Sequence, residues 1–256
     1  KFMGLIREKR LDELPATHPA DAVKLLAPLP NPASVRDFVS FETHIQNATR
    51  RSGDSMPKEW YEIPIFYFSN HRAIVGPEAS VQRPKKCARL DYECEIAVVI
   101  GKEGRDIKAG EADDYIFGYT ILNDWSARDL QAQEMKVRLG PAKGKDFATS
   151  IGPYIVTKDE LEKYRVGDRF DMPMKAFING RQLTDGNFKD IHYTFGQMME
   201  RASDDVTLYP GDIIGSGTVG LGCLLEMGPE VHRWLEPGDI VELEITGLGK
   251  LRNRIA

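Results

Sequence analysis

Residues 91–101 read Asp91-Tyr-Glu-Cys-Glu-Ile-Ala-Val-Val-Ile-Gly101. Alternate residues of a strand share a face, so this stretch predicts a strand over residues 92–100 with Glu93 and Glu95 on the same side, about 7 Å apart. Two carboxylates on an otherwise apolar face favour a hard cation such as Mg²⁺, Mn²⁺ or Ca²⁺. The alternative for this pair alone is a solvated sheet edge. The continuous apolar run of residues 96–100 argues against it, because such a run predicts burial on both faces.

A second apolar strand is predicted over residues 115–122, and Asp124 lies just beyond its end. Residues 126–129 fit an S-x-x-D helix start. On that helix Arg128 and Gln131 are three residues apart and share a face. A carboxylate beside a cation and an amide is suited to binding a carboxylate or enolate next to a metal. Helix capping and ordinary surface polarity are the alternative interpretation.

The remaining chain predicts a mixed α/β, β-rich fold in which turns separate short strands. A strand is predicted over residues 63–68 and a helix over residues 195–202. Another helix is predicted to begin at Ser34, with an S-x-x-D capping box and one face formed by Asp37, Phe41, His44 and Ala48. We expect residues 1–33 to form an incomplete N-terminal subdomain and linker, and residues 34–256 to form the catalytic domain.

Composition excludes several classes of protein. The chain has 256 residues and a formal net charge of -5, and it has no cluster of basic residues for nucleic acid. No apolar run approaches the roughly 20 residues of a membrane span. The 3 cysteines form no CxxC pair, which disfavours a zinc finger or a disulfide scaffold and favours a cytoplasmic location.

Four motifs together resemble the fumarylacetoacetate hydrolase family in order and spacing. They are D-Y-E-x-E at 91–95, N-D-W-S-A-R-D-x-Q at 123–131, G-K-D-F-A-T-S at 144–150 and G-D-I-I-G-S-G-T at 211–218. The resemblance implies a mixed β-sandwich roll with a small N-terminal subdomain, a homodimer, and bound Mg²⁺, Mn²⁺ or Ca²⁺. It also implies a small dicarbonyl or 2-oxo acid as the substrate.

The resemblance further implies roles for individual residues. Carried over to this sequence, the metal ligands are Glu93, Glu95, Asp124 and, as a further ligand, Asp37; the catalytic residues are His44, Glu226, Lys145 and Gln131; the substrate-binding residues are Arg128, Tyr67 and Thr218. His44 follows Asp37 by seven residues, as in the hydrolase branch of the family. Taken alone, His44 is equally a polar or core-capping residue of an amphipathic helix.

These residues predict a divalent-metal-dependent hydrolase that cleaves a C–C bond in a 1,3-dicarbonyl or 2-oxo acid, such as fumarylacetoacetate or an acylpyruvate. His44, oriented by Glu226, would take a proton from water. The alternative is a decarboxylase or isomerase of a 2-oxo acid of the oxaloacetate or 2-hydroxyhepta-2,4-diene-1,7-dioate type. A non-enzymatic binding module with the same fold is the third hypothesis. Arg50 and Arg51 either reach a distal carboxylate of the substrate or are solvated.

Two glycine motifs are not interpreted as nucleotide sites. Residues 215–220 fit G-x-G-x-x-G, but the segment 221–227 that follows looks strand-like, whereas a dinucleotide fingerprint opens a helix. Residues 140–145 resemble a phosphate-binding loop with one residue too few, and Asp146 replaces the required Ser or Thr.

Overall fold

The computed structural model of the protein describes residues 18, 19 and 22–256. The predicted N-terminal subdomain, residues 1–33, lies partly outside this range, and its boundary stays a prediction. Within the described range, no helix combines the length and the apolar character that a membrane span requires.

Two large sheets dominate the fold. The 7-stranded sheet has the order β2-β1-β14-β6-β7-β9-β3, with β1 at Val35–Phe38, β2 at Phe66–Ser69, β3 at Ile74–Val75, β6 at Cys94–Ile100, β7 at Ile116–Asp124, β9 at Thr149–Val156 and β14 at Ile213–Gly215. The 5-stranded sheet has the order β13-β12-β15-β16-β4, with β4 at Ser80–Val81, β12 at Pro173–Ile178, β13 at Arg181–Asn187, β15 at Ile240–Ile245 and β16 at Gly249–Ile255. Two short antiparallel pairs join β5 (Leu90–Asp91) to β8 (Ser126–Ala127) and β10 (Arg165–Val166) to β11 (Arg169–Phe170).

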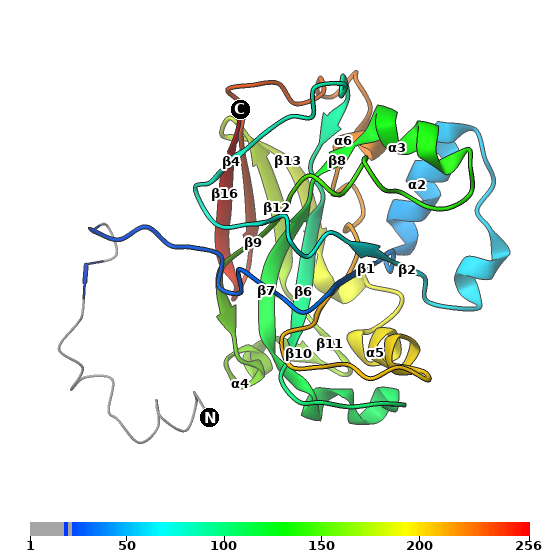
Figure 1. Cartoon of the computed structure of the whole chain (residues 1–256), viewed down its shortest axis with the longest axis vertical. Helices are drawn as coiled ribbons and strands as arrows, with labels where there is room; N and C mark the ends of the chain where they lie inside the picture. Colours follow the sequence, from blue (N-terminus) through cyan, green and yellow to red (C-terminus); the bar gives the residue numbers. More distant parts are fainter. Residues whose placement is uncertain (1–17, 20–21) are drawn as a thin grey trace.

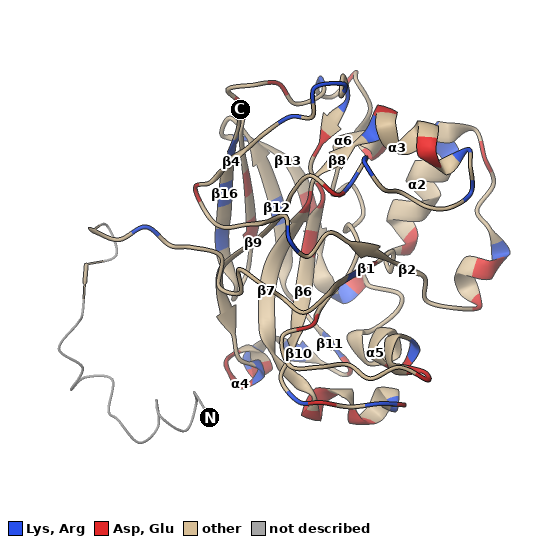
Figure 2. Ribbon diagram, in the orientation of Figure 1, with Lys and Arg blue, Asp and Glu red and all other residues tan. Residues whose placement is uncertain are grey.

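Short helices connect and cover these strands. The α-helices are α2 (Glu42–Ser52), α3 (Arg128–Met135), α4 (Lys158–Leu161), α5 (Phe195–Ser203) and α6 (Leu224–Met227). The 3-10 helices are η3 (Lys58–Tyr61), η4 (Ala109–Asp114), η5 (Glu162–Tyr164) and η6 (Phe188–Asp190). Figure 1 shows α2, α3 and α6 grouped together at one end of the molecule. Figure 2 shows acidic and basic positions interspersed along the helices, as on α3. The predicted mixed α/β, strand-rich fold is confirmed.

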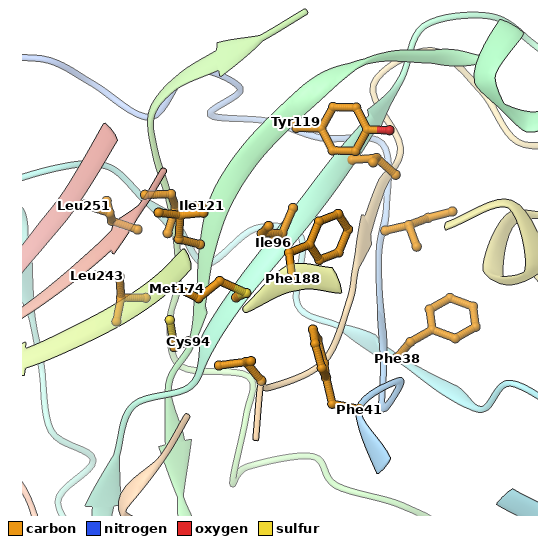
Figure 3. Packing of buried hydrophobic residues seen from close by; sticks show 14 of the residues in the cluster. Phe38, Phe41, Cys94, Ile96, Tyr119, Ile121, Met174, Phe188, Leu243 and Leu251 are labelled. Carbon is orange, nitrogen blue, oxygen red and sulfur yellow. The ribbon is translucent and has the colours of Figure 1, made fainter. Parts of the chain in front are cut away.

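Strand β6 is buried on both faces, and its two faces pack against different groups of residues. Cys94, Ile96 and Val98 belong to the main hydrophobic core, which also includes residues of β12, β15 and β16. Figure 3 shows Ile96 and Cys94 facing Met174, close to Leu243 and Leu251. Ala97 and Val99 point the other way, into a second, smaller apolar cluster. Glu93 and Glu95 continue the same alternation of side chains toward the N-terminus. Both carboxylates therefore lie on the side opposite the main core.

The predicted strands and one predicted helix are confirmed with small shifts at their ends. The strand predicted over 92–100 begins at Cys94, the one over 115–122 extends to Asp124, and the one over 63–68 begins at Phe66. Helix α5 contains the helix predicted over 195–202 and begins with a capping box formed by Thr194 and Gln197.

The helix predicted to begin at Ser34 is wrong in its first half. Val35–Phe38 is strand β1, which pairs with β14 on one side and β2 on the other, and the helix begins only at Glu42. The Ser34 hydroxyl donates to Asp212 Oδ1 at 2.6 Å instead of capping a helix. Sheet pairing with residues far away in the sequence therefore overrides the local capping signal. Asp37 leaves the helical face and joins the sheet.

Two other local predictions also fail. Helix α3 begins at Arg128 without a side-chain cap, because the Ser126 hydroxyl donates to the Asp124 carbonyl and the Asp129 carboxylate accepts from the Ala88 amide instead. The strand-like segment 221–227 contains the short helix α6, whose first amides are bound by a buried carboxylate described below.

Candidate active site

Four carboxylates from three strands and one loop meet at the ends of β1, β6 and β7. Asp37, Glu93, Glu95 and Asp124 each place a carboxylate oxygen within 4.8 Å of the others. All four residues are at most 4 % exposed. The structure therefore brings together the four residues that the sequence suggested as metal ligands, and it does so inside the protein rather than at a sheet edge.

The cluster has the features of a cation site. Asp37 Oδ1 and Asp124 Oδ1 are buried and have no hydrogen-bond partner among the described residues. Burial, followed by repulsion from neighbouring carboxylates, raises the pKa of Asp37 and of Glu95. Burial likewise raises the pKa of Asp124. A divalent cation would pair with the orphaned oxygens and allow these groups to ionise, and an all-oxygen donor set suits Mg²⁺, Mn²⁺ or Ca²⁺.

A glycine makes room for the cluster. A Cβ atom at Gly215 would lie 2.3 Å from Asp37 Oδ1 and 3.2 Å from Glu95 Oε2. Gly215 ends strand β14, which lies between β1 and β6 in the sheet. Only a residue without a side chain allows carboxylates from the two flanking strands to approach each other here.

Lys145 bridges two members of the cluster. Its Nζ lies 2.5 Å from Glu93 Oε2 and also donates to Asp124 Oδ2. Burial by itself would raise the pKa of Glu93, but Lys145 and then Arg128 outweigh burial and hold that pKa well below its ordinary value. Glu93 is therefore the one carboxyl of the four whose pKa is lowered, because it has two cations as neighbours.

Arg128 binds protein groups with each of its three guanidinium nitrogens. Nε donates to Asp91 Oδ2 at 2.8 Å, Nη2 to Glu93 Oε1 at 2.8 Å, and Nη1 to Gln131 Oε1 at 3.1 Å. The residue is buried. Its first effect is to hold two carboxylates in place, and the substrate contact that the resemblance implies stays a prediction.

Asp91 is a residue whose role the sequence analysis missed. It is fully buried, and its carboxylate accepts from the Leu224 and Leu225 amides at 2.8 and 3.0 Å as well as from Arg128. It thereby ties the first turn of α6 to the arginine that holds Glu93. Asp91 opens the quoted motif at 91–95, so an acid directly before the apolar strand predicted over residues 92–100 was the available signal.

His44 and Glu226 form a buried pair. His44 Nδ1 lies 2.8 Å from Glu226 Oε1. Glu226 also accepts from Asn47 Nδ2 at 3.0 Å and from the Leu221 amide at 2.8 Å. Burial opposes ionisation of Glu226, but His44 and these donors outweigh it and lower the pKa of the carboxyl. The carboxylate of Glu226 accepts a hydrogen bond at Nδ1 of His44, which orients the ring.

Asn47 is a second residue that the sequence analysis missed. It follows His44 by three residues on α2, so both side chains share a helical face and reach the same carboxylate. This spacing was the signal that could have identified it.

Two further predicted residues contact the carboxylates directly. The Tyr67 hydroxyl donates to Asp124 Oδ2. The Thr218 hydroxyl lies 3.5 Å from Glu95 Oε1, and the neighbouring Gly217 amide donates to Glu95 Oε2 at 3.0 Å. These donors bind oxygens of Asp124 and Glu95 and help to hold both carboxylates in place.

The predicted residues share a cavity of about 1010 Å³. It is lined by most of them, namely Asp37, His44, Tyr67, Glu93, Glu95, Arg128, Gln131, Lys145 and Thr218. Its remaining wall is largely apolar and includes Ile45, Phe66, Met135 and Leu225. An imidazole, a carboxylate cluster and hydrogen-bond donors that face one cavity are groups that can bind a small anion and exchange protons with it.

Comparison with known proteins supports an enzyme site. The sequence model described as "Fumarylacetoacetate (FAA) hydrolase C-terminal" matches residues 33–256. An uncharacterised protein of Methanocaldococcus jannaschii is 40% identical over 194 residues, which cover 76% of this chain and 73% of that protein. A mitochondrial oxaloacetate tautomerase of Bos taurus is 33% identical over 254 residues, which cover 99% of this chain and 76% of that protein. The crystal structure of 5-carboxymethyl-2-hydroxymuconate delta-isomerase from Mycobacterium smegmatis superimposes with a TM-score of 0.74 at 30% identity, covering 95% of this chain and 86% of that one.

Proposed function

The chain belongs to the fumarylacetoacetate hydrolase family, and on that premise we propose that it is a divalent-metal-dependent enzyme that interconverts the keto and enol forms of a 2-oxo acid. The observation that carries the proposal is the buried pair of His44 and Glu226, of which His44 lines the same cavity as the carboxylate cluster. Keto–enol interconversion requires one base that removes and returns a proton at carbon, and His44, oriented by Glu226, would supply it.

The four clustered carboxylates would hold the cation, which their unpaired buried oxygens fit. When bound, Mg²⁺ or Mn²⁺ would supply Lewis-acid polarisation of the substrate's 2-oxo and carboxylate oxygens. Ca²⁺ also matches the donor set.

The protein's own groups account for the proton transfer. Glu226 fixes the tautomer of His44 through Nδ1, so that Nε2 takes a proton from the carbon next to the keto group. The electron pair of that C–H bond becomes the C=C bond, and the carbonyl π pair moves to the keto oxygen, which takes a proton from water to form the enol; protonated His44 then releases its proton to water. In the reverse direction, His44 returns its proton to the carbon. Lys145 and Gln131 line the cavity and stabilise the negative charge that develops on oxygen.

C–C hydrolysis, which the sequence analysis predicted first, is the second candidate. The same His44–Glu226 pair can take a proton from water, and the attack of that water on a carbonyl of an acylpyruvate would break the neighbouring C–C bond. Decarboxylation of a 2-oxo acid stays open on the same machinery. Two of the three similar proteins favour tautomerisation or isomerisation, since one is named an oxaloacetate tautomerase and another a delta-isomerase. Homodimer formation, which the resemblance implies, stays a prediction.

The test compares substrates with and without metal. The purified chain, treated with EDTA and then supplied with Mg²⁺ or Mn²⁺, is mixed with enol oxaloacetate, and the loss of enol absorbance is followed. Acetylpyruvate and fumarylpyruvate are tested in parallel for release of pyruvate. We expect metal-dependent acceleration of ketonisation. Release of pyruvate without tautomerisation would favour the hydrolase instead, and inactivity with every substrate and both metals would refute the enzyme assignment.

His44→Ala is expected to lower the rate about 10²- to 10⁴-fold, which is the usual contribution of a general base. His71→Ala is the matched control, because His71 does not line the cavity. If His44→Ala retains the full rate, His44 is not the base.

A further inference from the structure

Four permanently charged cations line the cavity, and three of them are bound to protein groups. Lys145 bridges Glu93 and Asp124. Arg128 uses all three nitrogens within the protein, as described above. Arg51 donates to the Glu226 and Met227 carbonyls and to Glu230. Arg51, which the sequence analysis considered for a distal carboxylate, is therefore occupied at the C-terminal end of α6.

Arg89 is the fourth cation, and its guanidinium is free. Across the described ranges 18–19 and 22–256, its side chain forms no hydrogen bond and no ion pair, although it lines the cavity and is exposed. Arg50, the other arginine considered for a distal carboxylate, donates to Asn47 and does not line the cavity. Arg89 is thus the one cation of the cavity wall, among the described residues, whose charged group has no partner in the protein, so it is available for the far end of an anionic ligand.

The backbone holds Arg89 beside the site. Its carbonyl accepts from the Arg128 amide at 2.9 Å, at the first residue of α3. The next residues, Leu90 and Asp91, are fully buried in β5, so the chain cannot move away without opening the core. Only the side chain is free to move, at a position fixed next to Arg128.

We infer that Arg89 binds the distal carboxylate of the substrate, and that the enzyme therefore prefers 2-oxo dicarboxylic acids to 2-oxo monocarboxylic acids. This inference rests on the proposed function, which places the 2-oxo-carboxylate end of the substrate at the carboxylate cluster. A second carboxylate at the other end would lie in a cavity whose wall is mostly apolar. Leaving that carboxylate unpaired there would be unfavourable, and a free guanidinium on the wall supplies the planar, two-pronged donor that carboxylates bind best.

The effect is expected in KM. Arg89 contacts a part of the substrate that does not react, so its interaction is the same in the ground state and the transition state and weakens binding when lost. A hydrogen-bonded charge pair of this kind, partly open to water, corresponds to a change of about tenfold in affinity.

The test uses two acids that differ only in the distal group, oxaloacetate and 2-oxobutanoate. The enzyme is freed of Mn²⁺ and reloaded with Mg²⁺. NMR in D₂O then follows the exchange of the C3 hydrogens for deuterium, and the exchange rate measures proton transfer in the same way for both acids. For Arg89→Gln we expect KM for oxaloacetate to rise about tenfold, and KM for 2-oxobutanoate to change less than about twofold, because that acid has no distal charge to lose. Arg89→Lys should recover part of the loss, since it restores the charge but not the fork.

Arg181→Gln is the control, because Arg181 is also exposed but lies at the start of β13 and does not line the cavity. It should leave KM for both acids at the parent values. Equal effects of Arg89→Gln on both acids, or no effect on either, would overturn the inference while the proposed function stands. A parent enzyme that exchanges neither acid would overturn the proposed function, and this inference with it.

Discussion

Replacement of Arg128 by methionine is expected to destabilise the folded chain by about 3–5 kcal/mol, because it leaves the buried carboxylate of Asp91 without its cation. Methionine has a similar length and keeps the apolar packing of the arginine stem. The side chains of Arg128 and Asp91 are 5% and 0% exposed, so water cannot replace the lost guanidinium. Glu93 keeps Lys145 at 2.5 Å, and the cost therefore falls mainly on Asp91.

For a chain of this size, 1 kcal/mol corresponds to about 2–4 °C in Tm, so the loss amounts to about 6–20 °C. The assay is thermal unfolding of the full chain without added metal, which separates fold stability from cation binding. Arg165→Met is the matched control. Arg165 forms ion pairs with partners that are 50% exposed, and its removal should cost less than about 1 kcal/mol.

A double variant identifies the cause of the loss. Combining Arg128→Met with Asp91→Asn removes the unpaired charge, and an asparagine oxygen can still accept from the α6 amides. The double variant should therefore be more stable than Arg128→Met alone. If Arg128→Met lowers Tm by less than about 4 °C and instead raises KM, then Arg128 acts in substrate binding as the family resemblance implies, and the structural argument is refuted.

Three further predictions concern the metal, the glycine beside it and pH. Adding Mn²⁺ at about 100 times its Kd to EDTA-treated protein should stabilise the fold by about 2.7 kcal/mol, seen as a rise in Tm of about 5–11 °C; no rise with Mg²⁺, Mn²⁺ or Ca²⁺ would contradict a cation site. Gly215→Ala should abolish that rise, since its Cβ would lie 2.3 Å from Asp37 Oδ1, whereas Gly110→Ala, with nothing within 4 Å, should not. Burial opposes the ionisation of Asp239, but Arg233 and the Glu236 amide outweigh it and lower its pKa to about 2. Because the folded pKa is the lower one, Asp239 contributes stability above about pH 4 and loses that contribution as pH falls toward 2. Asp239→Asn should thus be less stable than the parent at pH 7 in urea unfolding, with the gap closing near pH 2; a constant gap would contradict this.

The strands of the central sheet are predictable because their signals are local. Residues 96–100 are apolar on both faces, and the helix at 195–203 carries its own capping box. The period of two also places Glu93 and Glu95 on one side of their strand. The motif combination then allows Asp124, Lys145 and His44 to be selected as candidates before any coordinates are known.

Strand β1 is the instructive failure. Its residues carry a helix-capping pattern, yet Val35–Phe38 pairs with β14 and β2. Strand β14 lies nearly 180 positions away in the sequence, so no local window contains the partner whose hydrogen bonds outweigh the capping signal. The same pairing moves Asp37 from a helix surface into the carboxylate cluster.

The sequence by itself determined the strand-rich fold, the residue types of the site and the alternation that turns two glutamates toward one side. Only the tertiary structure decided which nitrogens of Arg128 are occupied, that Asp91 joins α6 to Arg128, and that the guanidinium of Arg89 has no partner among the described residues. The physical reason is that alternation and capping act between neighbours in the chain, whereas the partner of a buried charge is determined by whichever distant residues the packed sheets bring within hydrogen-bond distance.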